Sequence, residues 1–232
     1  MFDIRRSAQV LLLLTAIVLL ALIAWSSTQK NSPFYQPIQA FELVSSVNQV
    51  TPQEIQKTVE PYLGKSFWDI PLNLIQADLV RLDWIESAEV KRKWPNLLYI
   101  WVKEQVPVAR WGEAGLVNQS GQVFFPLSIE GFENLVRLNG ALDESEDVLR
   151  NLIALQKSLT ALELMIEEIN LSADKVWHIQ ILNGPKIVLD SLDYEHKLQR
   201  FIMAYPKLES DMRKSARVYD LRYSNGFIIA QK

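Results

Sequence analysis

The chain of 232 residues has no cysteine, only two histidines and only eight glycines. Without cysteine it has no disulfide framework, no thiolate nucleophile and no cysteine-ligated metal. His178 and His196 form no H-x-x-x-H pair or other metal-binding spacing, which favours structural or surface roles for both. The P-loop, G-x-G-x-x-G and G-x-S-x-G motifs are also absent. The sequence therefore predicts a protein that is not an enzyme, with no catalytic residue, no metal, no cofactor and no small-molecule substrate.

The net charge is also small, −3 at neutral pH, whereas the hydrophobic fraction is 49%. That fraction is enough to build folded cores, and the acidic balance argues against nucleic acid as a partner.

One basic cluster with an aromatic, KRKW at 91–94, has three interpretations. It could bind nucleic acid, protect an exposed strand or turn from wrong pairing, or dock another protein; we favour protection of the strand.

Near the N-terminus, residues 7–29 contain no charge and are mostly Leu, Ile, Val and Ala. A helix needs about 20 apolar residues to cross a bilayer, so we predict a transmembrane helix at 10–29. Two arginines precede this segment, which by the positive-inside rule places a tail of residues 1–9 in the cytoplasm. A cleaved signal peptide is the alternative, but its apolar core would be shorter and the cleavage site here is poor. Residues 30–37 then form a polar linker with two prolines.

A first folded unit is predicted at 38–109. Thr51 and Glu54 match a capping box that opens a helix, and apolar spacings of three and four predict a second helix at about 74–82. The period then changes to two, in a pair of strands around a turn at 94–96. Together with a short strand before the first helix, the order is strand, helix, helix, strand, strand, which is a compact α+β unit.

A second unit is predicted at 110–232, as a mostly antiparallel β domain with helices on one face. Asn and Gly between strand-like runs indicate hairpin turns at 118–121 and 183–184. Helices are expected at about 143–162 and 194–205. The fold class of the whole chain is therefore α+β.

The last apolar stretch, Phe227 to Ala230, lies close to the C-terminus. If this strand sits at a sheet edge, its open N–H and C=O groups could take an added strand from a partner. The alternative is that a neighbouring strand of the protein covers it. The residue pattern leaves both arrangements open.

Five short motifs occur in order along the chain. They are LDWI at 82–85, AEV at 88–90, KRKWPNL at 91–97, VKEQVPVARW at 102–111 and DLRYSNG at 220–226. Behind an N-terminal anchor, they resemble the pattern of the FtsQ/DivIB family of bacterial cell division proteins: L-P-W-V, A-x-V, R-x-W-P-x-x-L, V-x-E-x-x-P-x-A-x-W and D-L-R-Y-x-x-G.

The resemblance implies a POTRA domain at 38–109 and a β domain at 110–232. It implies a single-pass protein of the bacterial inner membrane, with its bulk in the periplasm at the division septum. In that family the β domain binds FtsB, which is joined to FtsL, by taking an FtsB strand onto its last strand. The POTRA domain is linked to other divisome proteins. The implied function is that of a scaffold of the divisome.

The resemblance also implies a partner-binding site at the end of the chain. Arg222 and Tyr223 match the family motif, with Tyr as a rigid anchor and Arg as a donor to carboxylates. The turn and the pairing strand supply the remaining site residues, which are Asn225, Gly226, Phe227, Ile228 and Ile229.

Two positions depart from the family pattern. Asp83 stands where proline is usual, and Asp174 stands where some relatives have an arginine three residues before the tryptophan that matches Trp177. If that arginine helps to bind an acidic partner, the charge pattern differs in this chain, so Asp174 is not among the expected site residues.

Two other classes of protein remain as alternatives. A POTRA-bearing transport or chaperone protein usually carries several POTRA units or a large membrane barrel. An anchored enzyme would need a polar, concave pocket.

Overall fold

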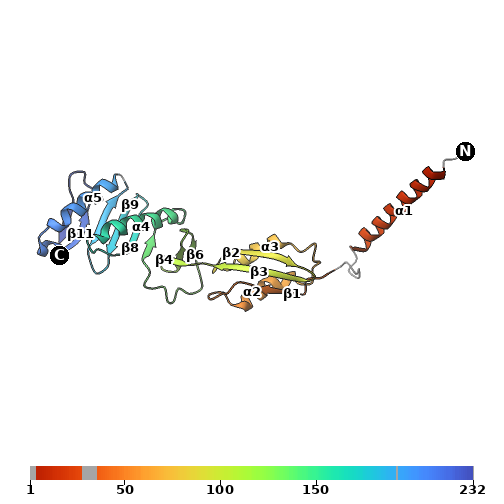
Figure 1. Ribbon diagram of the computed structural model, residues 1–232. Helices are drawn as coiled ribbons and strands as arrows, with labels where there is room; N and C mark the ends of the chain where they lie inside the picture. The colour runs from red at the N-terminus through yellow and green to blue at the C-terminus, as the bar shows by residue number, and fades with distance from the viewer. Residues whose placement is uncertain (1–3, 28–35, 192, 232) are drawn as a thin grey trace. The chain divides into compact units, whose positions relative to one another are not determined.

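The computed structural model describes residues 4–27, 36–191 and 193–231 (Figure 1). The first helix, α1 (Ile4–Ser27), contains most of the uncharged N-terminal segment. The rest of the predicted span and most of the predicted linker, at 28–35, lie outside the described residues. A search of the described residues finds no helix with both the length and the apolar character needed to cross a membrane.

The chain divides into two compact units, Met1–Glu104 and Gln105–Lys232. The predicted boundary between 109 and 110 falls inside strand β4 (Pro107–Trp111), which pairs with strands of the second unit. Each unit has its own hydrophobic core.

In the first unit, three strands and two α-helices follow the predicted order. They are β1 (Ala40–Leu43), α2 (Pro52–Val59), α3 (Leu72–Val80), β2 (Ile85–Lys93) and β3 (Leu97–Glu104), with a short 3-10 helix at Glu60–Tyr62. The sheet order is β1-β3-β2, with β1 parallel and β2 antiparallel to β3. This is the strand–helix–helix–strand–strand arrangement expected from the sequence.

Local sequence explains how this first unit forms. The predicted capping box is present, because Thr51 Oγ1 accepts from Glu54 N at 3.3 Å and Glu54 Oε2 accepts from Thr51 N at 2.8 Å. The helices and the sheet then share one core through their buried apolar faces. The core residues of these elements are Ile55, Val59, Ile75, Leu79, Ile85, Val90, Leu98, Ile100 and Val102.

The second unit is built on a nine-stranded sheet of order β12-β11-β10-β9-β8-β7-β4-β5-β6. Besides β4, the strands are β5 (Gly115–Asn118), β6 (Val123–Phe124), β7 (Arg137–Asn139), β8 (Ile166–Leu171), β9 (Val176–Ile181), β10 (Lys186–Asp190), β11 (Ala216–Asp220) and β12 (Ile228–Gln231). The helices are α4 (Ser145–Thr160), α5 (Tyr194–Ala204) and α6 (Ser210–Ser215), with short 3-10 helices at Leu142–Glu144 and Tyr205–Lys207.

The expectation of a mostly antiparallel sheet is met in part: five of the eight strand pairs among the described residues are antiparallel, but the sheet is mixed. β4–β7, β7–β8 and β10–β11 are parallel pairs among antiparallel ones. Parallel neighbours require a crossover connection rather than a hairpin. The helices provide two of these crossovers: α4 connects β7 to β8, and α5 with α6 connects β10 to β11.

The central strands β8, β9 and β10 bury one face and expose polar groups on the other. Apolar residues of these strands pack with α4 and α5 in the core of the second unit. Alternate positions, such as Asn170 and His178, carry the polar side chains. This period-two pattern explains why helices cover one face.

Glu104, the last residue of β3, has a structural role that its position in a family motif did not reveal. Its Oε1 atom accepts N–H groups from Asn48 at 3.0 Å, Gln49 at 2.8 Å and Val50 at 2.8 Å. Successive backbone N–H groups pointing at one carboxylate form a small anion nest. This contact ties the loop before α2 to the end of the sheet.

We predict that Glu104→Ala destabilises the first unit by about 1–3 kcal/mol, because several N–H groups lose a charged acceptor. Urea unfolding of the full chain, followed by hydrogen exchange at residues 48–50, measures the loss. Glu89→Ala is the control, since it removes an exposed ion pair with Lys91 (2.7 Å) and should cost no more than about 1 kcal/mol. Equal losses in the two variants would contradict the nest.

Candidate functional site

Strand β12 ends the nine-stranded sheet. Among the described residues its sheet neighbour is β11, with Tyr219 opposite Ile229 and Asp220 opposite Ile228. An edge strand presents a row of backbone N–H and C=O groups on its outer side. The sequence left open whether this strand lies at a sheet edge or is covered by a neighbouring strand. In the structure it lies at the edge.

The side chains of β12 alternate between the core and solvent. Ile229 lies opposite the fully buried Tyr219 and packs against the core of the second unit. Ile228 lies on the other face, opposite Asp220, and is 51% exposed. Ile228 is thus the large apolar side chain that this strand exposes to solvent, beside the small Ala230.

Phe227 was predicted to belong to the pairing strand, but β12 begins at Ile228 and Phe227 is half-buried. Its ring centroid lies 5.4 Å from that of Phe201 and 6.0 Å from that of Tyr219. Tyr205 packs against the same two rings. These contacts indicate that Phe227 holds the start of β12 on the core.

Arg222 is fixed by Asp220 two residues earlier. Its Nε and Nη2 atoms donate to Asp220 Oδ1 at 2.9 Å and Oδ2 at 2.7 Å, and its backbone N donates to Oδ1 at 3.1 Å. The hydrogen bonds from the Arg222 side chain lower the pKa of Asp220 below its ordinary value. A guanidinium carries five N–H donors, so this pair does not exhaust them.

The turn between β11 and β12 is open to solvent. Tyr223 is 51% exposed, and Arg200 Nη1 donates to its carbonyl oxygen at 3.4 Å. Asn225 is also exposed. A Cβ added at Gly226 would meet no atom within 4 Å, so the chain's own packing does not require glycine there.

Six of the seven predicted site residues fall into two groups, and the seventh, Gly226, is half-buried in the turn. Tyr223, Asn225 and Ile228 are exposed, as is Arg222, although it is held by Asp220. Phe227 and Ile229 instead pack inward. The structure thus brings the motif and the edge strand together at one end of the sheet.

Sequence reasoning missed several residues that shape this end. Asp220 was part of the recognised motif, so a signal for its role existed. The aromatic cluster under β12 was less visible, although Phe201 and Tyr205 are spaced by four on a predicted helix, which places them on one face. Arg200, which contacts the turn, carried no signal in the sequence.

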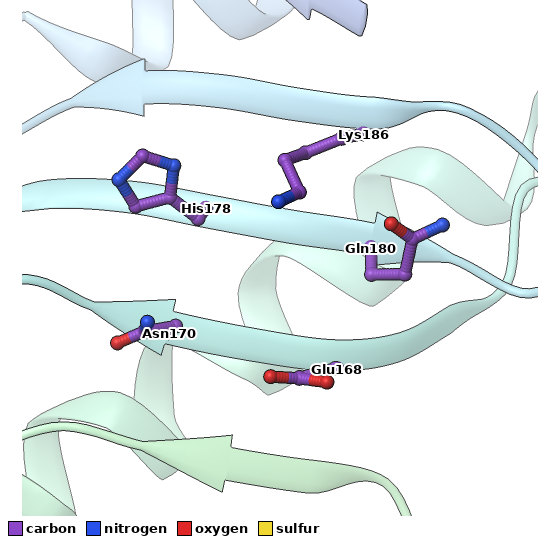
Figure 2. A pocket seen from close by; sticks show the side chains of 5 residues that line it. All are labelled: Glu168, Asn170, His178, Gln180 and Lys186. Carbon is purple, nitrogen blue, oxygen red and sulfur yellow. The ribbon is translucent and has the colours of Figure 1, made fainter. Parts of the chain in front are cut away.

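A polar hollow of about 310 Å³ lies on the solvent face of β8, β9 and β10, and Figure 2 shows its five side chains on one side of these strands. The lining residues are Glu168, Asn170, His178, Gln180 and Lys186. Arg137 Nη2 lies 2.9 Å from Glu168 Oε2, and Asn139 Nδ2 donates to Oε1 at 3.0 Å. The five side chains include no hydroxyl or thiol nucleophile.

Neither histidine belongs to a metal centre in the part of the chain that the structure describes, where no cluster of three or more potential ligands occurs. His178 lines the hollow, and the ring of His196 lies against Asp193. Asp174, which departs from the family pattern, accepts from the Ser172 hydroxyl at 2.5 Å. That hydrogen bond lowers the pKa of Asp174, and nearby His178 and Arg222 add to the effect.

The basic cluster at 91–94 is occupied by contacts within the first unit. Lys91 lies 2.7 Å from Glu89 and 5.2 Å from the centre of the Trp101 ring. Lys93 lies 4.3 Å from the centre of the Tyr99 ring. These contacts fit a solvated strand face better than a phosphate-binding surface.

The fold defines a two-domain protein, with a strand–helix–helix–strand–strand unit of the POTRA type followed by a mixed β domain that ends on an edge strand. The family model "POTRA domain, FtsQ-type" matches residues 37–105, and the model "Cell division protein FtsQ/DivIB, C-terminal" matches residues 109–222.

Individual relatives agree with these family models. A cell division protein FtsQ of Coxiella burnetii is 30% identical over 96% of this chain and 90% of its own length. FtsQ proteins of Xanthomonas campestris and Haemophilus influenzae are 31% and 32% identical, over 84% and 82% of this chain and 70% and 76% of their own lengths. The chain belongs to the FtsQ family of cell division proteins.

We predict that Asp220→Asn lowers stability in a pH-dependent way. Because the folded-state pKa of Asp220 is lowered, its contribution is complete above the unfolded-state pKa of about 4 and is lost as pH falls through the lower folded-state value. The stability gap between wild type and variant should therefore be largest at neutral pH and shrink below about pH 4.

Urea unfolding midpoints at a series of pH values measure this gap. Asp211→Asn, which removes an exposed carboxylate on α6, is the control for loss of a surface charge. A gap that stays constant down to acid pH, or one that matches the control, would show that the pair with Arg222 does not stabilise the fold.

Proposed function

We propose that this chain is a membrane-anchored scaffold of the bacterial divisome, which binds FtsB, and through it FtsL, by adding an FtsB strand to β12. The observation that carries the proposal is the position of β12 at the end of the nine-stranded sheet. A strand added there would satisfy backbone groups that otherwise hydrogen-bond to water.

The side chains around the edge support specific recognition of a strand. Main-chain hydrogen bonds give affinity in this mode, and exposed side chains at alternate positions give specificity. Tyr223 and Ile228 are the exposed apolar groups at this edge, each about half exposed. A tyrosine is a favoured hot-spot residue, because it buries a large area at low cost in side-chain entropy.

The positive charge of Arg222 at this edge favours a partner with an acidic residue. Arg222 lies next to Tyr223, and its guanidinium is held in place by Asp220. An arginine held in this way loses less conformational freedom when it donates to a partner carboxylate. We therefore expect an acidic residue in the partner segment that reaches the turn.

We also propose that residues 10–29 anchor the chain in the bacterial inner membrane at the division septum, with the N-terminus cytoplasmic and both units periplasmic. The uncharged segment and the two preceding arginines support this topology. In this arrangement the POTRA unit lies nearest the membrane along the chain and is available to other divisome proteins.

The alternatives have less support. The polar hollow on β8 to β10 is the concave site that an anchored enzyme would need, but its lining lacks a hydroxyl or thiol nucleophile and its glutamate is bound by Arg137 and Asn139. A transport or chaperone role would rest on the POTRA unit alone. Relatives named for cell division that match most of the chain favour the divisome.

Tyr223→Ala should weaken binding of the FtsB extracytoplasmic segment by about 2 kcal/mol, roughly 30-fold, without unfolding the chain. Calorimetry with the full chain in detergent measures the affinity, and circular dichroism checks the fold. Ile153→Ala, at a 63% exposed position on α4, is the matched control and should bind normally. Unchanged affinity in a folded Tyr223→Ala protein would refute the assignment of this residue.

Gly226→Ala should lower the affinity for the partner without lowering the stability of the fold. The added methyl group meets no atom of the chain within 4 Å, and substituting glycine reduces the freedom of the unfolded chain, so stability should stay level or rise by up to about 1 kcal/mol. A partner strand approaching β12 closely would meet the methyl group, and affinity should fall in the same calorimetric titration. Normal affinity would mean that the partner passes farther from residue 226.

A further inference from the structure

The chain enters the first unit between two loops. Segment 36–39 pairs on one side with the loop at 64–67: Ile38 N donates to Lys65 O at 2.9 Å, and Phe67 N donates to Gln36 O at 2.7 Å. On its other side Gln39 N donates to Asn96 O at 2.9 Å, and Asn96 Nδ2 donates to Gln39 Oε1 at 2.8 Å. The entry segment and these two loops therefore form one end of the unit.

A largely exposed tryptophan lies in or directly beside each of these loops. Trp68, directly after the first loop, is 69% exposed, and Trp94, in the turn before Asn96, is 72% exposed. Tryptophan is seldom left so open without a function, because it offers a large apolar ring to water. We call this end of the unit, which carries the exposed Trp68 and Trp94, the tryptophan end.

The tryptophan end is rigidly built. Arg92 donates through Nε to Phe67 O at 2.6 Å and through Nη2 to Trp68 O at 3.2 Å and Ile70 O at 2.9 Å. Phe67 is buried, and its ring meets that of Trp68 edge-on at 5.0 Å. Arg92 stands two residues before Trp94 on β2, so one side chain braces both tryptophan-bearing segments.

We infer that the tryptophan end rests on the interfacial region of the lipid bilayer, with Trp68 and Trp94 as interfacial anchors. This rests on the proposed membrane anchor. Only residues 28–35 separate α1 from segment 36–39, and eight residues span at most about 30 Å when fully extended. The end of the unit that the anchor reaches first is also the end that carries the exposed tryptophans, which favour the bilayer interface.

Charge at this end favours lipid insertion over electrostatic attraction. Lys65 lies 5.0 Å from the centre of the Tyr62 ring, and Lys93 lies 3.7 Å from Glu42. Asp69 is exposed beside Trp68, and the Arg92 guanidinium donates to carbonyl oxygens. Glu42 and Asp69 offset two of the three positive charges of Lys65, Arg92 and Lys93, so docking should gain little from anionic lipid and depend only weakly on salt.

Spin labelling of the full chain in lipid nanodiscs tests the inference, and the absence of native cysteine allows single labels. The test label replaces Asp69 (Asp69→Cys), beside Trp68. The matched control is Asp83→Cys, another exposed aspartate, placed just before β2 at the opposite end of the sheet. We expect the label at 69 to lose collisions with a water-soluble nickel complex and gain collisions with oxygen, while the label at 83 remains aqueous.

Adding Trp68→Ala and Trp94→Ala to the Asp69→Cys protein should return its label to the aqueous pattern. Trp101→Phe, on the middle of β3, should leave it protected. Circular dichroism checks that each variant folds. Equal aqueous exposure at 69 and 83 overturns the inference, as does protection at 69 that survives loss of both tryptophans or appears only with another protein added.

The same preparation separates this inference from the proposed function. A chain that fails to insert into nanodiscs overturns both the anchor and the docking of the tryptophan end. Insertion with an aqueous label at 69 overturns only the docking. FtsB binding at β12, measured with Tyr223→Ala, depends on neither label.

Discussion

The proposed function of this protein depends on one constraint, which is that the backbone groups on the outer edge of β12 have no strand beside them in the described sheet. Backbone N–H and C=O groups inside a sheet are paired by the neighbouring strand, but those on an edge must turn to water or to another chain. β12 is only four residues long and largely exposed, so it contributes little to the core by itself. The structure therefore retains an edge that a partner strand would complete.

The topology of the second unit brings β12 to the edge of the sheet. The crossover through α5 and α6 brings β11 beside β10 in a parallel pair, and the hairpin to β12 then adds the last strand. The aromatic rings of Phe201, Tyr219 and Phe227 hold the start of β12 against the core. A rigid base under an open edge reduces the ordering cost when a partner strand adds to it.

Several motif residues turn out to serve the fold. Glu104 accepts N–H groups of the loop before α2, and Arg92 donates to carbonyl oxygens of the loop before α3. In both cases a charged side chain on the three-stranded sheet supplies partners that the loop backbone lacks. In the second unit, Asp220 accepts both the backbone N–H and the guanidinium of Arg222, so this motif residue also serves the fold.

The sequence by itself determined the α+β class, the order of elements in the first unit and the hairpin turns, because caps, periodicity and turn residues act over a few neighbouring positions. Resemblance of short motifs pointed to the family. Only the tertiary structure decided that β7 pairs in parallel with β4 and β8 and that β11 pairs in parallel with β10. It also decided that β12 lies at the edge, and that Phe227 packs inward while Ile228 faces solvent. Those features depend on which strands meet across intervening helices, and pairing between distant segments is set by packing of the whole core.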